Sequence, residues 1–238
     1  MKVTDRGYAL ELDKNDPLAH YRSKFVITDP NLCYLDGNSL GRLPHASVKA
    51  MADFISHEWG NEVVNGWSHW IDEAQIAGDL LGRASLGAAA GQVLVCDTTS
   101  VNFYQLCMAA INARPGRKTI ITDAANFPTD RYILQGIAKQ LGMNLVVIDN
   151  EDPAIAENEL ITAELLEKYM TEDVALVTFE VIQYRSGARS DIQSITELAR
   201  SYGAYVVWDA SHATGAIEMN FDQCGVDLAV GCTYKYGN

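Results

Sequence analysis

Short apolar runs alternate with helical segments along most of the chain, and this pattern constrains the fold more than any other feature. The apolar runs predict strands at 92–96, 118–122, 144–148, 174–180, 204–208 and 226–231. The segments between them predict helices at 45–58, 69–86, 101–112, 128–141, 162–170 and 191–202. Strands that alternate with helices of this length form parallel βαβ units. The sequence therefore predicts a three-layer α/β/α fold with a mainly parallel sheet.

The N-terminal part of the chain lacks this alternation. Residues 1–35 are loosely helical in pattern, and the following LDGNSLGRLP is dense in Gly, Asn and Pro, which is typical of a loop. We therefore expect residues 1–44 to form a lead-in segment with an active-site loop, and residues 45–238 to form one major domain.

Composition excludes several classes of function. With 18 Lys and Arg against 31 Asp and Glu, the net charge is −13, so nucleic acid and anionic membrane surfaces are disfavoured as partners. No apolar run is long enough to span a membrane, and the polar N-terminus is unlike a signal peptide. The 5 cysteines form no CxxC pair, so we expect no disulfide framework and no metal site. Free thiols suit the reducing cytoplasm, which is the expected location.

Ligands of parallel α/β folds bind beyond the carboxyl ends of the strands, so the residues there are the candidates for a site. The segment Asp97–Ser100 (DTTS) joins a predicted strand to a predicted helix. Hydroxyl groups and free N–H groups at a helix N-terminus bind anions such as phosphate, although Ser and Thr are also ordinary N-caps. The chain has neither the P-loop nor the dinucleotide-binding glycine pattern.

An acid and a lysine follow two later strands. Asp209, in VVWDASH, would either cap the next helix or pair with a cationic ring nitrogen such as that of pyridoxal phosphate. His212 would be either a structural histidine or a neighbour of the same ring. Lys235 lies between Tyr234 and Tyr236, and desolvation makes a lysine amine a nucleophile for aldehydes. The acid, the lysine and the upstream phosphate cradle together are what a pyridoxal-phosphate enzyme needs.

Seven motifs between residues 34 and 236 carry a family resemblance. They are YLDGNSLGRLP, EWGNEVVNGW, DTTSVNFY, NFPTDRYI, QYRSG, WDASHATGA and GVDLAVGCTYKY. In these motifs the chain resembles the kynureninases, which are pyridoxal-phosphate enzymes of fold type I and relatives of the class-V aminotransferases. The resemblance implies pyridoxal 5′-phosphate as the cofactor, a homodimer as the assembly, and a fold-type-I major domain whose C-terminal small domain is missing here.

The resemblance also implies a role for residues at each strand end. Lys235 matches the lysine that bonds covalently to the cofactor, and Asp209 matches the acid paired with its pyridine nitrogen. Thr99 and Ser100 match the phosphate-binding pair, and Tyr234 matches a tyrosine that contacts the phosphate. The other positions implied to contact the cofactor are Phe127, whose ring would stack on it, Pro128, Thr129, Asp130, Glu180 and His212.

Two further residues match the substrate side of the family site, namely Ser39 and Trp67. Trp67 would lie near the aryl ring of the substrate, or alternatively would be an indole of the core. Glu180 departs from the small or imidazole side chains of the family at its position. Because a carboxylate there would repel the phenolic oxygen of the cofactor, Glu180 is expected either to turn away or to be protonated.

The implied reaction is hydrolysis of L-kynurenine or 3-hydroxykynurenine to anthranilate or 3-hydroxyanthranilate and L-alanine, in tryptophan degradation or NAD biosynthesis. Lys235 would take the α-proton, Asp209 would keep the ring nitrogen protonated, and Tyr234 is a candidate for activating water. Two alternatives stay open. One is another class-V enzyme, such as a cysteine desulfurase or an aminotransferase, and the other is a non-catalytic binding domain.

The resemblance ends with two departures from the family. After the lysine the family continues Tyr-Leu-Asn, whereas this chain has Tyr236, Gly237 and Asn238. Kynureninases also continue well beyond this point, with a small domain and an arginine that grips the substrate carboxylate. We therefore expect these 238 residues alone to be inactive and poorly stable, because the sheet would expose faces that further elements cover.

Overall fold

The computed structural model describes residues 2–237, so the last residue of the predicted 45–238 domain, Asn238, lies outside the described part. The chain forms two compact units, residues 2–68 and His69–Gly237. The predicted boundary at residue 44 stays a prediction. Within residues 2–237 no helix is both long and apolar enough to cross a membrane.

The first unit is built from helices and a long loop. Its α-helices are α1 (Arg6–Lys14), α2 (His45–Asp53) and α3 (Gly60–Glu62). A π-helical turn at Phe54–Trp59 continues α2, and an antiparallel bridge joins Phe25 to Pro44 across the glycine-rich loop. Large apolar side chains of this unit are exposed, including Met51 at 60% and Trp59 at 61%. The unit therefore has little apolar core of its own.

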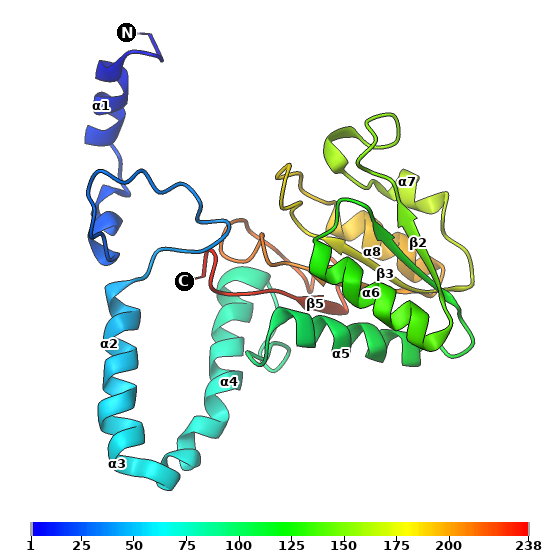
Figure 1. Ribbon diagram of the computed structural model, residues 1–238, viewed down its shortest axis with the longest axis horizontal. Helices are drawn as coiled ribbons and strands as arrows, with labels where there is room; N and C mark the ends of the chain where they lie inside the picture. The colour runs from blue at the N-terminus through cyan, green and yellow to red at the C-terminus, as the bar shows by residue number, and fades with distance from the viewer. Residues whose placement is uncertain (1, 238) are drawn as a thin grey trace. The chain divides into compact units, whose positions relative to one another are not determined.

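The second unit contains a five-stranded sheet whose strands are all parallel, in the order β2-β1-β3-β4-β5 (Figure 1). The strands are β1 (Thr119–Asp123), β2 (Asn144–Ile148), β3 (Val174–Glu180), β4 (Tyr205–Asp209) and β5 (Leu228–Val230). Every residue of the central strand β3 is buried. Strands covered on both faces are continuous apolar runs, which is why the sequence predicts this sheet correctly.

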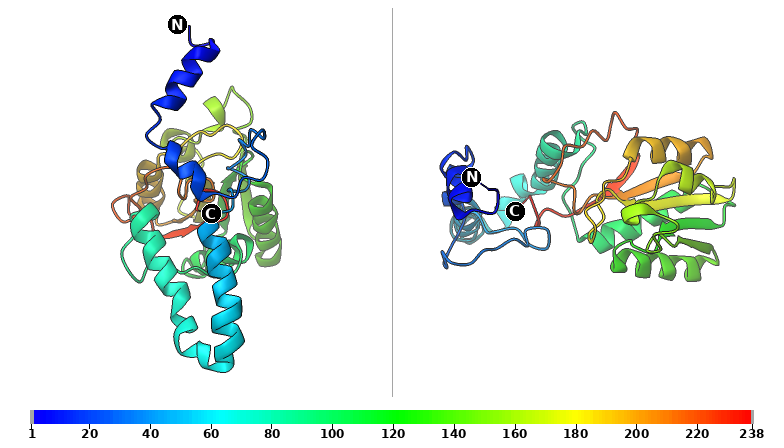
Figure 2. Two further views of the ribbon diagram at one scale, coloured as in Figure 1. Left: turned by 90° about the vertical axis from the view of Figure 1, so that its left-hand side faces the viewer. Right: turned by 90° about the horizontal axis from the view of Figure 1, so that it is seen from above.

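Helices cover both faces of the sheet, as Figure 2 shows from above. The helices of this unit are α4 (Trp67–Leu81), α5 (Thr99–Asn112), α6 (Pro128–Leu141), α7 (Ala163–Glu167) and α8 (Ile192–Ser201). Helices α5 and α6 pack on one face, where Phe103 and Leu134 meet Leu176 in one apolar cluster. Helices α7 and α8 pack on the other face, where Leu166 and Ile195 join the second cluster. Helices thus cover both faces of the central strands, and the poor stability expected of these 238 residues alone stays a prediction.

The predicted strand at 92–96 is wrong. The segment runs along α4 instead of joining the sheet. The Val95 N–H donates to the carbonyl of Ala74 (3.1 Å), and the side-chain amide of Gln75 donates to the carbonyl of Val93 (2.9 Å). Because α4 supplies these partners, the apolar run satisfies part of its backbone without pairing with a strand.

Three strands end in a carboxylic acid at the same edge of the sheet. Asp123, Glu180 and Asp209 are the last residues of β1, β3 and β4. The register of the ladder pairs Glu180 directly with Asp209. Ligands of parallel sheets bind at this edge, so the fold places acidic side chains where a site is expected.

Candidate active site

A cavity of about 190 Å³ opens at the carboxyl edge of the sheet. It is lined by Thr99, Ser100, Phe127, Thr129, Asp130, Asp209, Ser211, His212, Tyr234 and Lys235. All of these except Ser211 are residues that the sequence predicts for a cofactor site. Ser211 lies between Asp209 and His212, directly after β4, and its position beyond a strand was the signal that could have identified it.

Lys235 is the cationic side chain of this cavity, and it is only 7% exposed. Its Nζ lies 2.7 Å from Nε2 of His212 and 5.8 Å from the centroid of the Phe127 ring. Burial, together with the nearby charge of Lys235, lowers the pKa of His212. The imidazole is therefore neutral at physiological pH, and its Nε2 accepts a hydrogen bond from Lys235.

The first turn of α5 forms one wall of the cavity. Thr98 caps the helix, since its hydroxyl accepts a hydrogen bond from the Val101 N–H (3.3 Å). The Thr99 hydroxyl donates to the carbonyl of Gly231 (3.0 Å) and so ties the helix to the segment after β5. Thr98 therefore takes the ordinary capping role, which leaves the N–H groups of the first turn and the Ser100 hydroxyl for an anion.

Two aspartates form the acidic wall. Asp209 is 4% exposed and accepts a hydrogen bond from the Ser211 N–H (2.8 Å). Asp130, in the first turn of α6, is 2% exposed, and its Oδ2 has no hydrogen-bond partner. Burial first, and then the charge of Asp209, raise the pKa of Asp130. Asp130 therefore tends to keep its proton, and its carboxyl group lies beside that of Asp209 in the wall of the cavity.

An aromatic wall completes the cavity. Phe127 directly precedes α6 and is 37% exposed. Pro128 is the first residue of that helix, where a missing N–H costs nothing, and it does not line the cavity. The ring of Tyr184 meets Phe127 edge to face, with 5.2 Å between the ring centroids. Sequence reasoning missed Tyr184, although the QYRSG motif contains it.

Glu180 does not line the cavity either and is 1% exposed. Burial, followed by the charges of Asp209, Asp123 and Asp130, raises its pKa to about 9. Its side chain is thus a neutral acid at physiological pH, packed behind the wall that Asp209 forms.

The two predicted substrate residues belong to the first unit or its edge. Ser39 lies in a turn, where its hydroxyl donates to Oδ1 of Asp36 (2.7 Å). Trp67 begins α4 and is 63% exposed, so the alternative that it is a core indole is wrong. A role of either residue toward the substrate stays a prediction.

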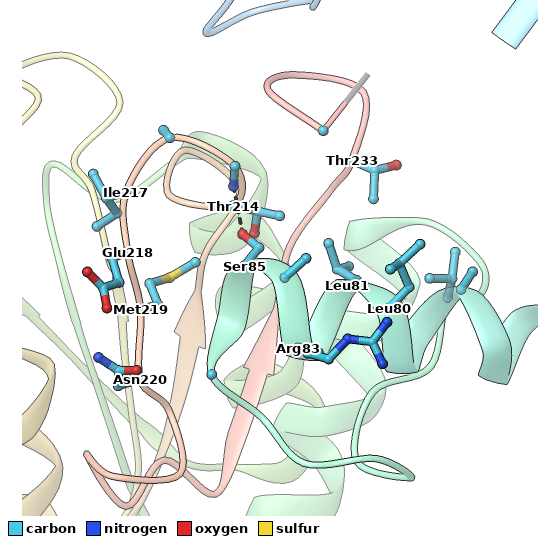
Figure 3. A pocket seen from close by; sticks show the side chains of 17 residues that line it. Leu80, Leu81, Arg83, Ser85, Thr214, Ile217, Glu218, Met219, Asn220 and Thr233 are labelled. Atoms are coloured by element: carbon cyan, nitrogen blue, oxygen red, sulfur yellow. Dashed lines mark hydrogen bonds between the residues drawn. The ribbon is translucent and has the colours of Figure 1, made fainter. Parts of the chain in front are cut away.

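A second, larger hollow of about 900 Å³ lies between α4 and the segment 214–220 (Figure 3). Its Ser85 hydroxyl accepts a hydrogen bond from the Gly215 N–H (2.8 Å) and is therefore engaged in the fold. The residues that line it include neither lysine nor histidine. Because the buried amine and the acids lie in the smaller cavity, we place the active site there.

Comparison with known proteins identifies the family to which this fold belongs. Residues 33–236 match the aminotransferase class-V family. The kynureninase of Pseudomonas fluorescens is 36% identical over 244 residues, covering 99% of this chain and 55% of that protein. The kynureninase of Deinococcus radiodurans is 37% identical over 233 residues, covering 95% of this chain and 53% of that protein. The chain thus spans about half the length of the curated relatives it matches.

Solved structures share the fold at low sequence identity. A structure of SspA in complex with cysteine has a TM-score of 0.70 at 14% identity, covering 85% of this chain and 57% of that one. The cysteine desulfurase CsdA of Escherichia coli has a TM-score of 0.68 at 19% identity, covering 91% of this chain and 54% of that one. The parallel sheet has the fold of the pyridoxal-phosphate enzymes of fold type I.

The chain belongs to the aminotransferase class-V family. Members of this family and the kynureninases depend on pyridoxal 5′-phosphate. The residues present fit that cofactor. Lys235 supplies a buried amine, the Asp130–Asp209 pair supplies a buried negative charge with an unpartnered oxygen, and the first turn of α5 supplies N–H groups for a phosphate.

Proposed function

We propose that this chain is the cofactor-binding part of a kynureninase, which hydrolyses L-kynurenine or 3-hydroxykynurenine to L-alanine and the matching anthranilate. The observation that carries the proposal is the buried Lys235 in a cavity shared with Asp209, within a chain 36% identical to a kynureninase over nearly its whole length. Relatives named for desulfuration share the fold at 19% identity, which supports the fold alone.

Each wall of the cavity holds one part of the cofactor. Pyridoxal phosphate, when bound, supplies an aldehyde that bonds to an amine and a ring that accepts electrons from the substrate. Lys235 would supply the amine, Asp209 would pair with the ring nitrogen, and the α5 first turn with Thr99 and Ser100 would hold the phosphate. Phe127 would stack on the ring, and Thr129, Asp130 and His212 line the remaining wall.

Lys235 and His212 form the proton-handling pair of the site. The neutral His212 Nε2 accepts a hydrogen bond from Lys235 at 2.7 Å and fixes the direction of its amine. Lys235 would hold the cofactor through its amine, and the same amine is placed to take the α-proton of a substrate bound in this cavity. Because the Lys235 amine is buried, it can take up a proton without first losing bound water.

Tyr234 serves best as a hydrogen-bond donor. It lines the cavity, and burial, together with the neighbouring Cys232, raises the pKa of its phenol. A phenol that holds its proton donates to a phosphate oxygen, and it donates to the carbonyl oxygen of the substrate more readily than it removes a proton from water. Tyr234 is therefore proposed as a phosphate contact and a carbonyl-polarising donor, and its part in activating water would be that of orienting it.

The activity, the assembly and the location are proposed for the whole protein and not for this chain alone. The chain covers 55% of the kynureninase of Pseudomonas fluorescens, so the hydrolytic activity, the homodimer and the cytoplasmic location are proposed for the whole protein. Ser39 and Trp67 are proposed as substrate contacts, with the exposed Trp67 indole available to an aryl ring. The chain by itself is proposed to bind the cofactor without turning over kynurenine.

The proposal is tested by presenting the whole protein, loaded with pyridoxal phosphate, with three amino acids in turn. In the whole protein, kynurenine should yield fluorescent anthranilate and alanine. Release of sulfide from cysteine would instead identify a desulfurase, and conversion of the cofactor to its amine form by glutamate would identify an aminotransferase. A chain that binds no pyridoxal phosphate would contradict the proposal and favour the binding-domain alternative.

A further inference from the structure

Glu180 lies next to Asp209 but outside the cavity. The two residues end the neighbouring strands β3 and β4 and are directly paired in register. Paired residues of adjacent parallel strands project to the same face of the sheet, so the two carboxyl groups share one face. Glu180 is 1% exposed and does not line the cavity, whereas Asp209 does. Glu180 can thus act on a bound cofactor only through its neighbours.

The groups that face Glu180 are acidic or are hydrogen-bond donors. Asp209 approaches it from β4, Asp123 from β1 and Asp130 from α6, and none of the ion pairs within residues 2–237 involves Glu180. Its Oε1 has no hydrogen-bond partner. A buried carboxylate with acidic neighbours and no cation is strongly disfavoured, so the group keeps its proton.

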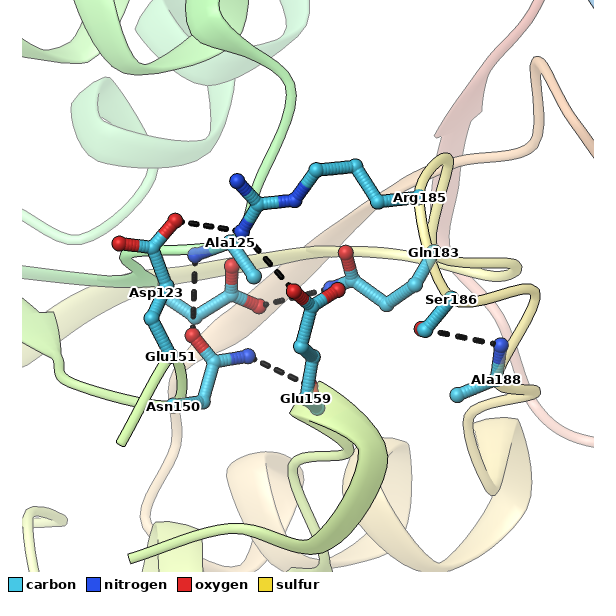
Figure 4. Close-up of polar contacts among 9 residues, drawn as sticks. All are labelled: Asp123, Ala125, Asn150, Glu151, Glu159, Gln183, Arg185, Ser186 and Ala188. Atoms are coloured by element: carbon cyan, nitrogen blue, oxygen red, sulfur yellow. Dashed lines mark hydrogen bonds and ion pairs between the residues drawn. The ribbon is translucent and has the colours of Figure 1, made fainter. Parts of the chain in front are cut away.

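Gln183 connects two of these acids. With its amide oriented so that the nitrogen meets acceptors, that nitrogen donates to Glu180 Oε2 (2.8 Å) and to the carbonyl of Ala125 (3.1 Å). The amide oxygen then takes the place that lies 3.4 Å from Oδ2 of Asp123. Figure 4 shows Gln183, Asp123 and Ala125 together at this edge. Glu180 therefore accepts a hydrogen bond on one oxygen and has one oxygen free to carry a proton.

The segment that Glu180 contacts is a tight hairpin. The Gln183 N–H donates to the carbonyl of Ala188 (2.9 Å), and a bridge joins Ile182 to Arg189. The backbone amide of Tyr184 acts on the Glu180 carboxyl group and partly offsets the rise of its pKa. Because the ring of Tyr184 packs against Phe127, the position of this hairpin sets the aromatic wall of the cavity.

We propose that Glu180 is a positioning residue that acts as a neutral acid behind Asp209, holding the 182–189 hairpin at the sheet edge and leaving Asp209 as the charged carboxylate that faces the cofactor. The inference rests on the proposed function, because it assumes that the ring nitrogen of the cofactor meets Asp209. Ionisation of Glu180 would place a second negative charge beside Asp209, which favours the protonated ring nitrogen and changes the cofactor absorbance.

The variant Glu180→Gln keeps the shape and the neutrality of the side chain, and Glu180→Leu removes its polar atoms. Infrared spectroscopy of the cofactor-free chain at pH 7 should show the carbonyl band of a buried protonated carboxyl group, weakened in Glu180→Gln. The control Glu167→Gln, on the exposed side of α7, should leave the band unchanged. Glu180→Leu should lower the affinity for pyridoxal phosphate by about ten-fold, because Gln183 loses an acceptor.

The absorbance of bound pyridoxal phosphate, followed between pH 7 and 10, provides the second readout. The unmodified chain should show a step near pH 9 that Glu180→Gln lacks, while both bind the cofactor equally at pH 7. An infrared band of undiminished intensity in Glu180→Gln, or an alkaline step common to both proteins, would overturn the inference. Failure of the unmodified chain to attach the cofactor to Lys235 would contradict the proposed function instead, and the infrared comparison would still decide the state of Glu180.

Discussion

The side-chain nitrogen of Lys235 lies 2.7 Å from Nε2 of His212, in a cavity that Asp209 also lines. Lys235 follows β5 in the chain and His212 follows β4, so two loops from neighbouring strands bring the pair together. The amine, its acceptor and the acid each come from a carboxyl-end segment, as expected for a parallel sheet. The predictions below concern this arrangement and the fold that supports it.

Removal of the His212 imidazole should lower the affinity of the cavity for pyridoxal phosphate. His212→Ala leaves the buried amine without its acceptor, and a hydrogen bond to a charged group contributes about 1.5–3 kcal/mol, so a roughly ten-fold or larger loss of affinity is expected. His212→Gln keeps an acceptor and should restore much of the binding. The exposed His45→Ala is the matched control, and absorbance titration with the cofactor is the measurement. Equal affinity in His212→Ala and His45→Ala would contradict the assigned contact.

Substitution of Ser100 should weaken the grip on the phosphate alone. Ser100→Ala removes the hydroxyl that lines the cavity at the first turn of α5 but keeps the helix N–H groups. Affinity for pyridoxal phosphate should fall by about five- to ten-fold, the loss of one hydrogen bond of about 1–1.4 kcal/mol, while affinity for pyridoxal without its phosphate stays the same. A parallel loss for both ligands would place the phosphate elsewhere.

The packing of α4 against the 92–96 segment depends on Gly78. A Cβ built at Gly78 would lie 2.0 Å from the carbonyl oxygen of Val93, whereas one at Gly136, in α6, meets nothing within 4 Å. Gly78→Ala should therefore destabilise the chain despite the better helix propensity of alanine. Gly136→Ala should stabilise it by up to about 1 kcal/mol. Urea denaturation measures both, and equal stabilisation by the two changes would contradict the described packing.

The buried Asp123 should make stability fall as the pH rises. Burial raises its pKa to about 7 in the folded chain, against 3.8 for an exposed aspartate. The folded state thus binds this proton more tightly than the unfolded state. The free-energy cost of ionising the buried carboxyl group is therefore absent below about pH 4, grows as the pH rises, and levels off above about pH 7.

Asp123→Asn removes this cost at high pH. The difference in unfolding free energy between Asp123→Asn and the unmodified chain should increase from pH 5 to pH 8, by about 1.4 kcal/mol for each unit of pKa difference crossed. Urea midpoints at the two pH values supply the measurement. A difference that is independent of pH would show that Asp123 is not held neutral.

Much of the sheet was predictable because its strands are buried on both faces. The runs at 144–148 and 174–180 coincide with β2 and β3, and the helix predicted at 128–141 coincides with α6. The run at 92–96 has the same apolar character, yet α4 supplies its backbone partners. Local pattern alone does not distinguish a strand from an extended segment that pairs with a helix.

The candidate site was predictable where a chemical group follows a strand. Lys235, Asp209 and His212 follow that rule, and the structure brings them into one cavity. Glu180 was expected to contact the cofactor, but it does not line the cavity. Its place beside Asp209 depends on the strand register and on the hairpin that follows β3, and neither can be read from the sequence pattern. Tyr184 lies in a hairpin whose packing against Phe127 depends on long-range contacts, for which the sequence contains no periodic signal.

The account depends most directly on Lys235 as the residue that bonds to the cofactor. The chain would be incubated with pyridoxal phosphate, reduced with borohydride, digested and analysed by mass spectrometry, beside Lys235→Ala and the exposed Lys168→Ala. The account predicts one reduced adduct on Lys235, retained in Lys168→Ala and absent from Lys235→Ala. Labelling spread over exposed lysines, or an undiminished adduct in Lys235→Ala, would contradict it.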